Sequence, residues 1–354
     1  MTLHIFNPEH DLVLAGNTAN FMAPHAARQL KTGLGFLPAL WASDGDAVLV
    51  EDRDYALKAL KRASVQAERQ FERVWFIEPS GLPSLCFSRI EPWGWDVALR
   101  NFLLRHGVDK GLLPDLEQLD GLRMMSHRLT SHKLLDCLSG TDGLVGQSFA
   151  CVSMEEVSGC VSRLGQAVIK APWSCSGRGL RFVDGDISEP HLYGWIKNML
   201  AAQGSLMVEP YYRKVKDFGM EFSCDGNGCV SYEGLSLFDT VNGAYTGNII
   251  ATEQTKLEMI SRYVPAVLLE KIKESICNFT AGELGGRYTG AFGVDMMVVP
   301  CADRDGFLVH PCVEINLRRT MGHVALSLSP ADDDIKKVMR ITADDNYQLK
   351  IKPL

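Results

Sequence analysis

Two acidic side chains near position 300 constrain the fold most, because they lie on apolar segments that a turn signal joins. The segment 291–295 ends in Asp295, and a second segment carries Glu314 and Asn316. The polar run 301–306 between them ends in Asp-Gly, which favours a hairpin. A chain that folds back near position 304 or 305 places Asp295 opposite Glu314. Asn316, two residues further on, shares the face of Glu314.

These three side chains are candidate metal ligands. Carboxylate and amide oxygens are hard ligands of the kind that Mg²⁺ prefers, and Mg²⁺ usually also holds phosphates. Two acids that face each other directly repel unless a cation lies between them. The hairpin therefore predicts a site for Mg²⁺, with Mn²⁺ as the alternative ion, formed by Asp295, Glu314 and Asn316, and chemistry on ATP. The competing interpretation is the polar face of an exposed hairpin.

Composition excludes several classes of protein. The chain has 354 residues, of which 46% are hydrophobic and 22% charged, as in ordinary soluble globular proteins. Its net charge of −7 argues against a nucleic-acid surface. No apolar run reaches the roughly 18 to 20 residues that a membrane helix needs, and no signal peptide is apparent. Ten cysteines without a C-x-x-C pair indicate reduced thiols. We expect a cytoplasmic protein with no nucleic-acid or membrane partner, and leave a homodimer open.

The first 120 residues alternate short apolar strands with helical stretches, which predicts an open, mainly parallel α/β sheet. Its first strand, 3–6, runs into the polar segment 7–11, interpreted as a loop at the carboxyl end of the strand, where such sheets place ligands. Glu9, His10 and Arg28 are therefore candidates for recognising a substrate. A capped turn without a ligand explains the segment equally well.

A second cluster follows a strand predicted over 167–170. The strand delivers Lys170 to a loop that contains Ser176, Gly177, Arg178 and Gly179. Glycine lets backbone amides approach phosphate oxygens closely, and a lysine adds a positive charge. A tight turn explains the two glycines about as well as a phosphate-binding loop does.

A third cluster follows a strand predicted over 206–209. This strand ends in Glu209, close to Tyr211, and Asp217 lies eight residues beyond Glu209. Such a segment suits the wall of an adenine pocket, with Asp217 accepting hydrogen bonds from ribose. An ordinary strand end with solvated acids is the alternative.

In this order, the clusters resemble the ATP-grasp superfamily over residues 126–330. The resemblance implies a fold class of α/β (α+β grasp), in which an N-terminal open α/β domain, 1–120, precedes a small subdomain, 121–204, and a large subdomain, 205–354. It also implies roles for individual residues. Lys133 and Lys170 would bind phosphates with the loop 176–179, Glu209 and Tyr211 would hold adenine, and Arg318 of the E-x-N-x-R run would hold the transferred group.

The activity that the resemblance implies is an ATP- and Mg²⁺-dependent ligase. It would join a small-molecule or peptide carboxylate to an amine, or less readily a thiol, through an acyl phosphate, with Arg318 and Lys170 as catalytic residues. Two alternatives stay open at this point. One is a small-molecule kinase on the same scaffold, and the other is a nucleotide-binding module without turnover.

Overall fold

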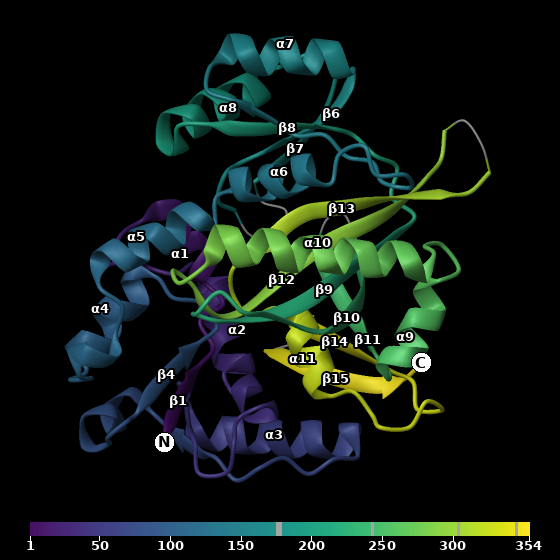
Figure 1. Ribbon diagram of the computed structural model, residues 1–354. Coiled ribbons are helices and arrows are strands. Elements are labelled where there is room, and N and C mark those ends of the chain that lie inside the picture. Colours follow the sequence, from purple (N-terminus) through teal and green to yellow (C-terminus); the bar gives the residue numbers. More distant parts are fainter. Residues whose placement is uncertain (175–178, 242–243, 303–304, 344–345) are drawn as a thin grey trace.

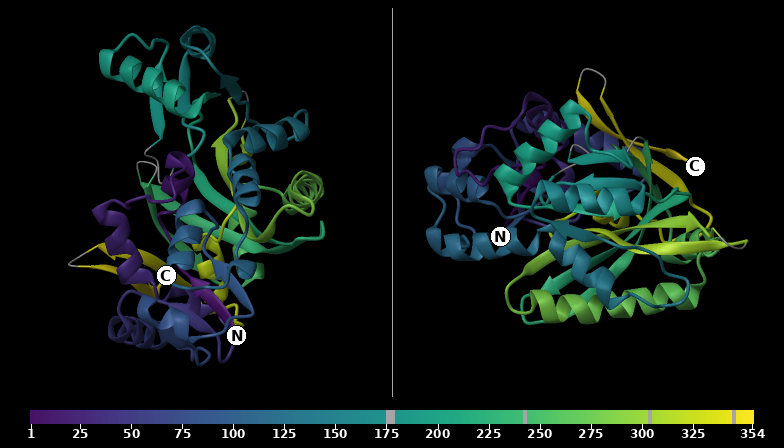
Figure 2. Two further views of the ribbon diagram at one scale, coloured as in Figure 1. Left: turned by 90° about the vertical axis from the view of Figure 1, so that its left-hand side faces the viewer. Right: turned by 90° about the horizontal axis from the view of Figure 1, so that it is seen from above.

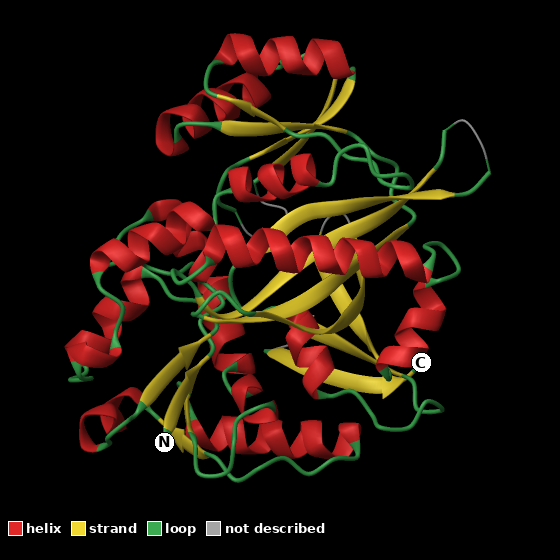
Figure 3. Ribbon diagram, in the orientation of Figure 1, coloured by secondary structure: helices red, strands yellow, loops and turns green. Residues whose placement is uncertain are grey.

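The computed structural model describes residues 1–174, 179–241, 244–302, 305–343 and 346–354. Within these residues the strands form three sheets: an N-terminal sheet, a small antiparallel sheet and a large antiparallel sheet (Figures 1 and 3). The mixed α/β architecture with two grasp-like sheets confirms the predicted fold class.

The N-terminal sheet is open and parallel, with strand order β3-β2-β1-β4. Its strands and neighbouring helices are β1 (Thr2–Ile5), α1 (His10–Gly16), α2 (His25–Leu34), β2 (Ala47–Leu49), α3 (Arg53–Ala67), β3 (Trp75–Ile77), β4 (Arg89–Pro92), α4 (Val97–Arg105) and α5 (Leu116–Met125). Three short 3₁₀ helices join them: Leu37–Leu40, Pro79–Ser84 and Lys110–Leu112.

The segment after β1 differs from the expected loop, because helix α1 begins at His10. A turn from the carbonyl of Asn7 to the amide of His10 starts it. The side chain of Asn7 donates to the carbonyl of Gly94, at 2.8 Å, and to Asp96, at 3.1 Å. These bonds fix the end of β1 against the segment after β4, so the polar residues after the strand lie on a short helix.

The small sheet has strand order β5-β8-β6-β7 and is antiparallel throughout. Its elements are α6 (Arg128–Cys137), β5 (Phe149–Cys151), α7 (Met154–Leu164), β6 (Gln166–Lys170), β7 (Leu180–Asp184), α8 (Pro190–Gln203) and β8 (Leu206–Pro210), of which α6 packs on the large sheet instead. The expected subdomain boundary at 204/205 falls just before β8, which pairs with β5 and β6. Figure 2 shows this unit standing away from the N-terminal sheet.

The large sheet has seven strands in the order β13-β12-β9-β10-β11-β14-β15. Its elements are β9 (Lys216–Asp225), β10 (Val230–Val241), β11 (Ala244–Ile250), α9 (Glu253–Ile260), α10 (Ala266–Leu284), β12 (Thr289–Pro300), β13 (Phe307–Asn316), α11 (Met321–Ser327), β14 (Lys337–Ala343) and β15 (Tyr347–Pro353). Helix α10 covers one face and contributes Ile272 and Ile276 to the main core. Helix α11 lies against the opposite face.

The two faces of the large sheet have different chemistry because side chains alternate along its strands. On β9 and β12, the residues Phe218, Phe222 and Phe292 enter the core beneath α10. The intervening residues, among them Glu221 and Asp295, lie on the opposite face, toward the small sheet and the N-terminal domain. This second face carries the polar residues described below. Within the described residues, no helix is long and apolar enough to cross a membrane.

The Phe222–Phe292 pair tests how strongly the core beneath α10 stabilises the large sheet. Both rings are fully buried and stack with centroids 5.2 Å apart. We expect Phe292→Ala to lower the free energy of unfolding by about 3–5 kcal/mol, because it leaves a cavity in a close-packed core. Urea denaturation followed by circular dichroism measures this change. The matched control Phe182→Ala, at a ring that is 64% exposed, should change it by less than about 1 kcal/mol. Equal effects of the two variants would contradict the assigned core.

Candidate active site

The β12–β13 ladder places Asp295 opposite Glu314, which confirms the predicted pairing. The route to it differs from the expected one. Near the turn Pro300 pairs with Phe307, a register that would continue to place Asp295 opposite Cys312. An irregularity between Asp295 and Met297 shifts the ladder by two residues. Pro311 lies in that stretch of β13 and has no amide hydrogen to donate, which explains why the ladder breaks there.

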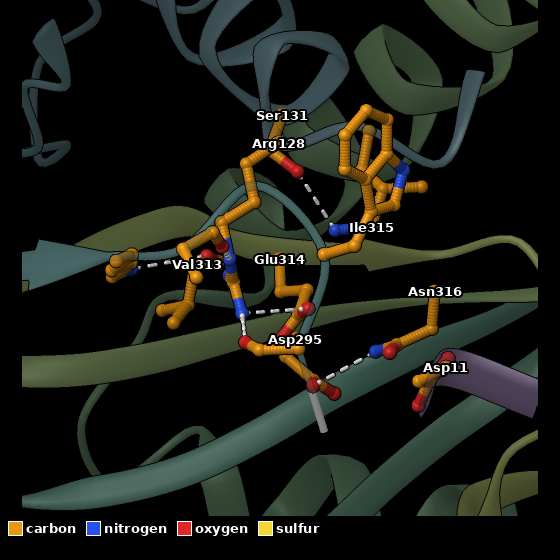
Figure 4. A network of polar contacts seen from close by, with 12 residues as sticks. Asp11, Arg128, Ser131, Asp295, Val313, Glu314, Ile315 and Asn316 are labelled. Atoms are coloured by element: carbon orange, nitrogen blue, oxygen red, sulfur yellow. Dashed lines mark hydrogen bonds and ion pairs between the residues drawn. The ribbon is translucent and has the colours of Figure 1, made fainter. Parts of the chain in front are cut away.

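The two opposed carboxylates are stabilised from different directions (Figure 4). A nitrogen of the Arg128 guanidinium, from the first turn of α6, lies 2.8 Å from Glu314. The side-chain amide of Asn316 donates to Asp295 at 3.0 Å. Burial and then the charge of Glu314 raise the pKa of Asp295 to about 7. The surrounding side chains thus offset only part of the repulsion between the two carboxylates.

A chain of polar contacts continues from this pair to the N-terminal domain. The amide oxygen of Asn316 accepts from Arg318 at 2.9 Å. The guanidinium of Arg318 donates in turn to both oxygens of Asp11 on α1, at 2.8–3.1 Å. Burial alone would raise the pKa of Asp11, but the charge and hydrogen bonds of Arg318 outweigh it, so that the pKa is lowered. Arg318 therefore joins the hairpin to the N-terminal domain through a two-pronged, charge-assisted contact.

Lys170 connects the small sheet to the large one. Its ammonium group lies 2.6 Å from Glu209 on the neighbouring strand β8, and it donates to the backbone carbonyl of Val313 at 3.3 Å. Ser148 donates to the second oxygen of Glu209 at 3.3 Å. Both members of the Lys170–Glu209 pair are largely buried. The structure therefore places the predicted phosphate lysine and hinge acid together. Lys170 bonds the residue just before Glu314, one of the predicted metal ligands.

Lys133 is not brought to this cluster. Its side chain is 54% exposed and pairs with Glu283 of α10 at 2.6 Å. Arg128 lies there instead, and it also donates to the carbonyl of Ala171 at 3.0 Å, next to Lys170. The buried residues of α6 are Arg128, Thr130, Ser131, Leu134 and Leu135. This helical spacing was visible in the sequence, and it already places Lys133 on the outer face.

The remaining nucleotide candidates lie at the edges of the cluster. Tyr211 is half-exposed with its ring edge against Phe182. Asp217 pairs with Lys214 at 2.5 Å, and its charge contributes to the raised pKa of Asp295. A side chain at Gly179 would overlap Ser174, with Cβ atoms 2.3 Å apart, so glycine permits this close approach. The predicted phosphate contacts of Ser176, Gly177 and Arg178 lie outside the described residues.

The three substrate candidates of the N-terminal domain divide between two cavities. Glu9 and Arg28 line a cavity of about 390 Å³ at the carboxyl ends of the parallel strands. His10 lines a second hollow of about 20 Å³, together with Asp11, Glu314, Asn316 and Arg318. The expected recognition of substrate by these residues stays a prediction. The structure adds that helix α1 separates the two spaces.

Sequence reasoning missed Glu221, which lies fully buried on the same face of the sheet as Asp295. Its oxygen Oε2 is 3.0 Å from Nδ1 of His323, whose Nε2 lies 3.2 Å from the carbonyl of Phe222. A carbonyl only accepts, so Nε2 carries the ring proton, and Nδ1 accepts from the backbone amide of Thr320 at 3.2 Å. The Glu221 oxygen beside it has no hydrogen-bond partner among the described residues. Burial and then the charge of Asp295 raise the pKa of Glu221 to about 8, so this acid is mainly neutral at pH 7.

The cluster fits a divalent cation by its donor set. Asp295 and Glu314 are opposed carboxylates with an amide beside them, and the raised pKa of Asp295 shows that negative charge there is not fully compensated. Within the described residues, no three His, Cys, Asp or Glu side chains come close enough together to hold a metal. The hairpin thus offers two carboxylates, while Asn316 turns its amide nitrogen to Asp295 and its oxygen to Arg318. Two carboxylates suit an ion that takes its other ligands from phosphates and water.

No protein-family model matches the chain, and no curated protein matches it in sequence. Solved structures do match it. N5-carboxyaminoimidazole synthetase from Staphylococcus aureus, complexed with ADP, has a TM-score of 0.50 at 13% identity, covering 96% of this chain and 82% of that one. The biotin carboxylase domain of 2-oxoglutarate carboxylase from Hydrogenobacter thermophilus, complexed with MgADP, ADP and bicarbonate, has a TM-score of 0.52 at 13% identity, covering 86% and 76%.

A third match is a protein from Archaeoglobus fulgidus assigned to the ATP-grasp superfamily. Its TM-score is 0.51 at 12% identity, and the match covers 100% of this chain and 99% of that one. At these identities the likeness concerns the fold. The chain has the ATP-grasp fold, including the N-terminal sheet that the sequence resemblance did not cover.

The neutral state of Glu221 predicts a pH-dependent stability. Between about pH 4.5 and 8 the unfolded chain has lost this proton while the folded chain keeps it, so stability falls as pH rises. Glu221→Gln removes the titration and keeps a neutral side chain of the same size. We expect the unfolding free energy of the variant, relative to the wild type, to rise by up to about 1.4 kcal/mol per pH unit across this range. Urea denaturation at pH 5, 6, 7 and 8 measures it, and a pH-independent difference would contradict a buried neutral acid.

Proposed function

We propose that the protein is an ATP- and Mg²⁺-dependent ligase that joins a carboxylate to an amine through an acyl phosphate, in a soluble cytoplasmic setting. The observation that carries the proposal is the cluster of Asp295, Glu314 and Asn316 beside Arg318, which faces Arg128 and Lys170 on elements that precede it. The bound nucleotides of the two enzymes with the same fold support it.

The proposed binding roles follow from charge and position. Lys170 and Arg128 provide positive charge for the phosphates, and Arg128 takes the part that Lys133 was expected to play. Glu209, Tyr211 and Asp217 remain the candidates for adenine and ribose. Asp295, Glu314 and Asn316 would hold Mg²⁺, which supplies charge neutralisation between phosphate oxygens when bound.

In this proposal the protein acts mainly by positioning and electrostatics. A substrate carboxylate attacks the γ-phosphorus of ATP, a bond to the carboxylate oxygen forms, and ADP leaves. Arg318 lies two residues from Asn316 and is held by Asp11, which keeps its guanidinium on the side of the cluster that faces the N-terminal domain. There it would hold the acyl phosphate while the amine attacks.

The proposed nucleotide site lies where the small sheet meets the large one. Lys170 is paired with Glu209, and the hollow beside Trp173 and Glu314 measures about 20 Å³. That space holds about one water molecule. In this proposal the phosphates would replace Glu209 as the partner of Lys170, and the bond from Lys170 to the backbone of Val313 would give way as the nucleotide enters between the two sheets.

The first test of the ligase proposal removes a metal ligand. Incubation with Mg-ATP and pooled carboxylates and amines should release ADP, and Glu314→Gln should lower that release by at least about 100-fold, since charge neutralisation at the phosphates is lost. Glu283→Gln, an acid on α10 outside the cluster, is the matched control and should behave as the wild type. Mass spectrometry of the products separates an amide from a phosphorylated product, which would indicate a kinase. ATP-dependent stabilisation without ADP would indicate a binding module.

A second test compares the two basic residues of α6. Arg128→Ala should lower ADP release by at least about 100-fold and raise the KM for ATP, because a buried guanidinium beside the phosphate site is lost. Lys133→Ala should change both parameters by less than about twofold, since its side chain is exposed and pairs with Glu283. Steady-state kinetics measure both. A large loss in Lys133→Ala with full activity in Arg128→Ala would contradict the arrangement of the site.

A further inference from the structure

Two cavities flank the start of helix α1. The larger one, of about 390 Å³, belongs to the N-terminal domain, and Glu9, Val13 and Asp96 are among the residues that line it. The smaller hollow belongs to the proposed catalytic centre and is lined from the N-terminal side by His10 and Asp11. Residues of one short helix thus line both cavities: Val13 the larger one, and His10 and Asp11 the smaller one. The first turn of α1 lies between the two spaces.

His10 lies in this partition and is held in one orientation. Its Nδ1 is 3.1 Å from Oδ2 of Asp96, and both side chains are at least 97% buried. Asp96 also accepts from the side chain of Asn7 at 3.1 Å and from the amide of Leu99 at 2.8 Å. A carboxylate that accepts from all sides fixes the proton of the imidazole on Nδ1. Nε2 then carries a lone pair.

Nε2 of His10 has no hydrogen-bond partner in the part of the chain that the structure describes, and the ring lines the catalytic hollow. The ring packs against Gly94, where a Cβ would lie 2.6 Å from it, so the backbone leaves just enough room for the imidazole. The other proton acceptors that line the hollow are engaged. Asp11 is bound by Arg318, and Glu314 by Arg128.

We propose that Nε2 of His10 accepts the proton that the attacking amine loses, with Asp96 as its positioning residue. The proposal rests on the proposed ligase activity and adds a base to it. A buried imidazole whose second nitrogen is held by a carboxylate is the arrangement in which histidine acts as a general base.

The step balances as follows. The lone pair of an uncharged amine forms a C–N bond to the acyl carbon of the acyl phosphate, and the C–O bond to phosphate breaks. The phosphate leaves with that electron pair. The excess proton on nitrogen passes to Nε2 of His10, and the imidazolium that forms lies beside Asp96, with Asp11 and Arg318 opposite as a neutral pair. The proton then returns to solvent.

The alternative is a purely structural role, in which the Asn7, Asp96 and His10 contacts only fasten the ends of β1 and β4. His10→Asn separates the two roles. An asparagine amide can still donate to Asp96 in place of Nδ1, but it offers nothing in place of Nε2. The exposed His25, on α2, lines neither cavity, so His25→Asn is the matched control.

The experiment compares two nucleophiles in the same reaction. Wild-type protein is incubated with Mg-ATP and pooled carboxylates, once with a pool of primary amines that includes amino acids and once with hydroxylamine, which is largely uncharged near neutral pH and needs no base to attack an acyl phosphate. We expect the ratio of amide to hydroxamate to fall by at least about 100-fold in His10→Asn, and to stay at the wild-type value in His25→Asn. An unchanged ratio in His10→Asn would overturn the role of His10 and leave the ligase proposal standing.

A second measurement does not depend on turnover. Nitrogen NMR of protein labelled at histidine reports which ring nitrogen is protonated, and the His10 signals are those missing from His10→Asn. We expect the proton on Nδ1 in the wild type and a shift toward Nε2 in Asp96→Asn. A wild-type ring protonated on Nε2 would overturn the proposal. Absence of both ADP and hydroxamate in the wild type would remove the ligase proposal itself, together with the step that rests on it.

Discussion

The carboxyl groups of Asp295 and Glu314 face each other across one rung of the β12–β13 ladder, and their repulsion must be offset for the hairpin to form. The compensating groups come from different parts of the chain: Arg128 from the start of α6, and Asn316 with Arg318 from the end of β13. Arg318 extends the contact to Asp11. The large sheet, helix α6 and the N-terminal domain therefore meet around one local excess of negative charge.

Close packing beneath the cluster leaves room for one further acid, Glu221, which is buried. A side chain at Gly293 would lie 2.4 Å from Glu221, and one at Gly322 would lie 1.8 Å from it, so both glycines leave space for a buried acid. Glu221 is tolerated there because burial keeps it neutral, and the His323 ring beside it is fixed by its own bond to the backbone of β9. The burial that makes the protonated form of Glu221 favourable also raises the pKa of Asp295. A cation at the cluster would offset the repulsion between Asp295 and Glu314.

The hairpin site was predictable because alternation and a turn signal suffice to place two strands in register. Lys170 and Glu209 were found because each ends an apolar strand. Arg128 was overlooked in favour of Lys133, although the helical spacing of Ser131, Leu134 and Leu135 already indicated the buried face. The contacts of Asp11 and Glu221 depend on tertiary packing between segments hundreds of residues apart or on neighbouring strands. Local sequence patterns carry no information about such contacts. They do not predict the two-residue shift of the ladder near Pro311 either.

The contacts of Lys170 with both sheets have an energetic consequence for the proposed binding of ATP. Lys170 and Glu209 compensate each other in a largely buried pair, and Lys170 also bonds the backbone of β13. Moving the sheets apart breaks the bond from Lys170 to the backbone of β13. Phosphate oxygens would replace Glu209 as the partner of Lys170, and they are stronger partners than a single carboxylate. A ligand shifts such an equilibrium only by its difference in affinity for the two states. Since a purine without phosphates offers nothing to Lys170, the phosphates rather than the base would drive the opening, and the same exchange would free Glu209 to contact the base.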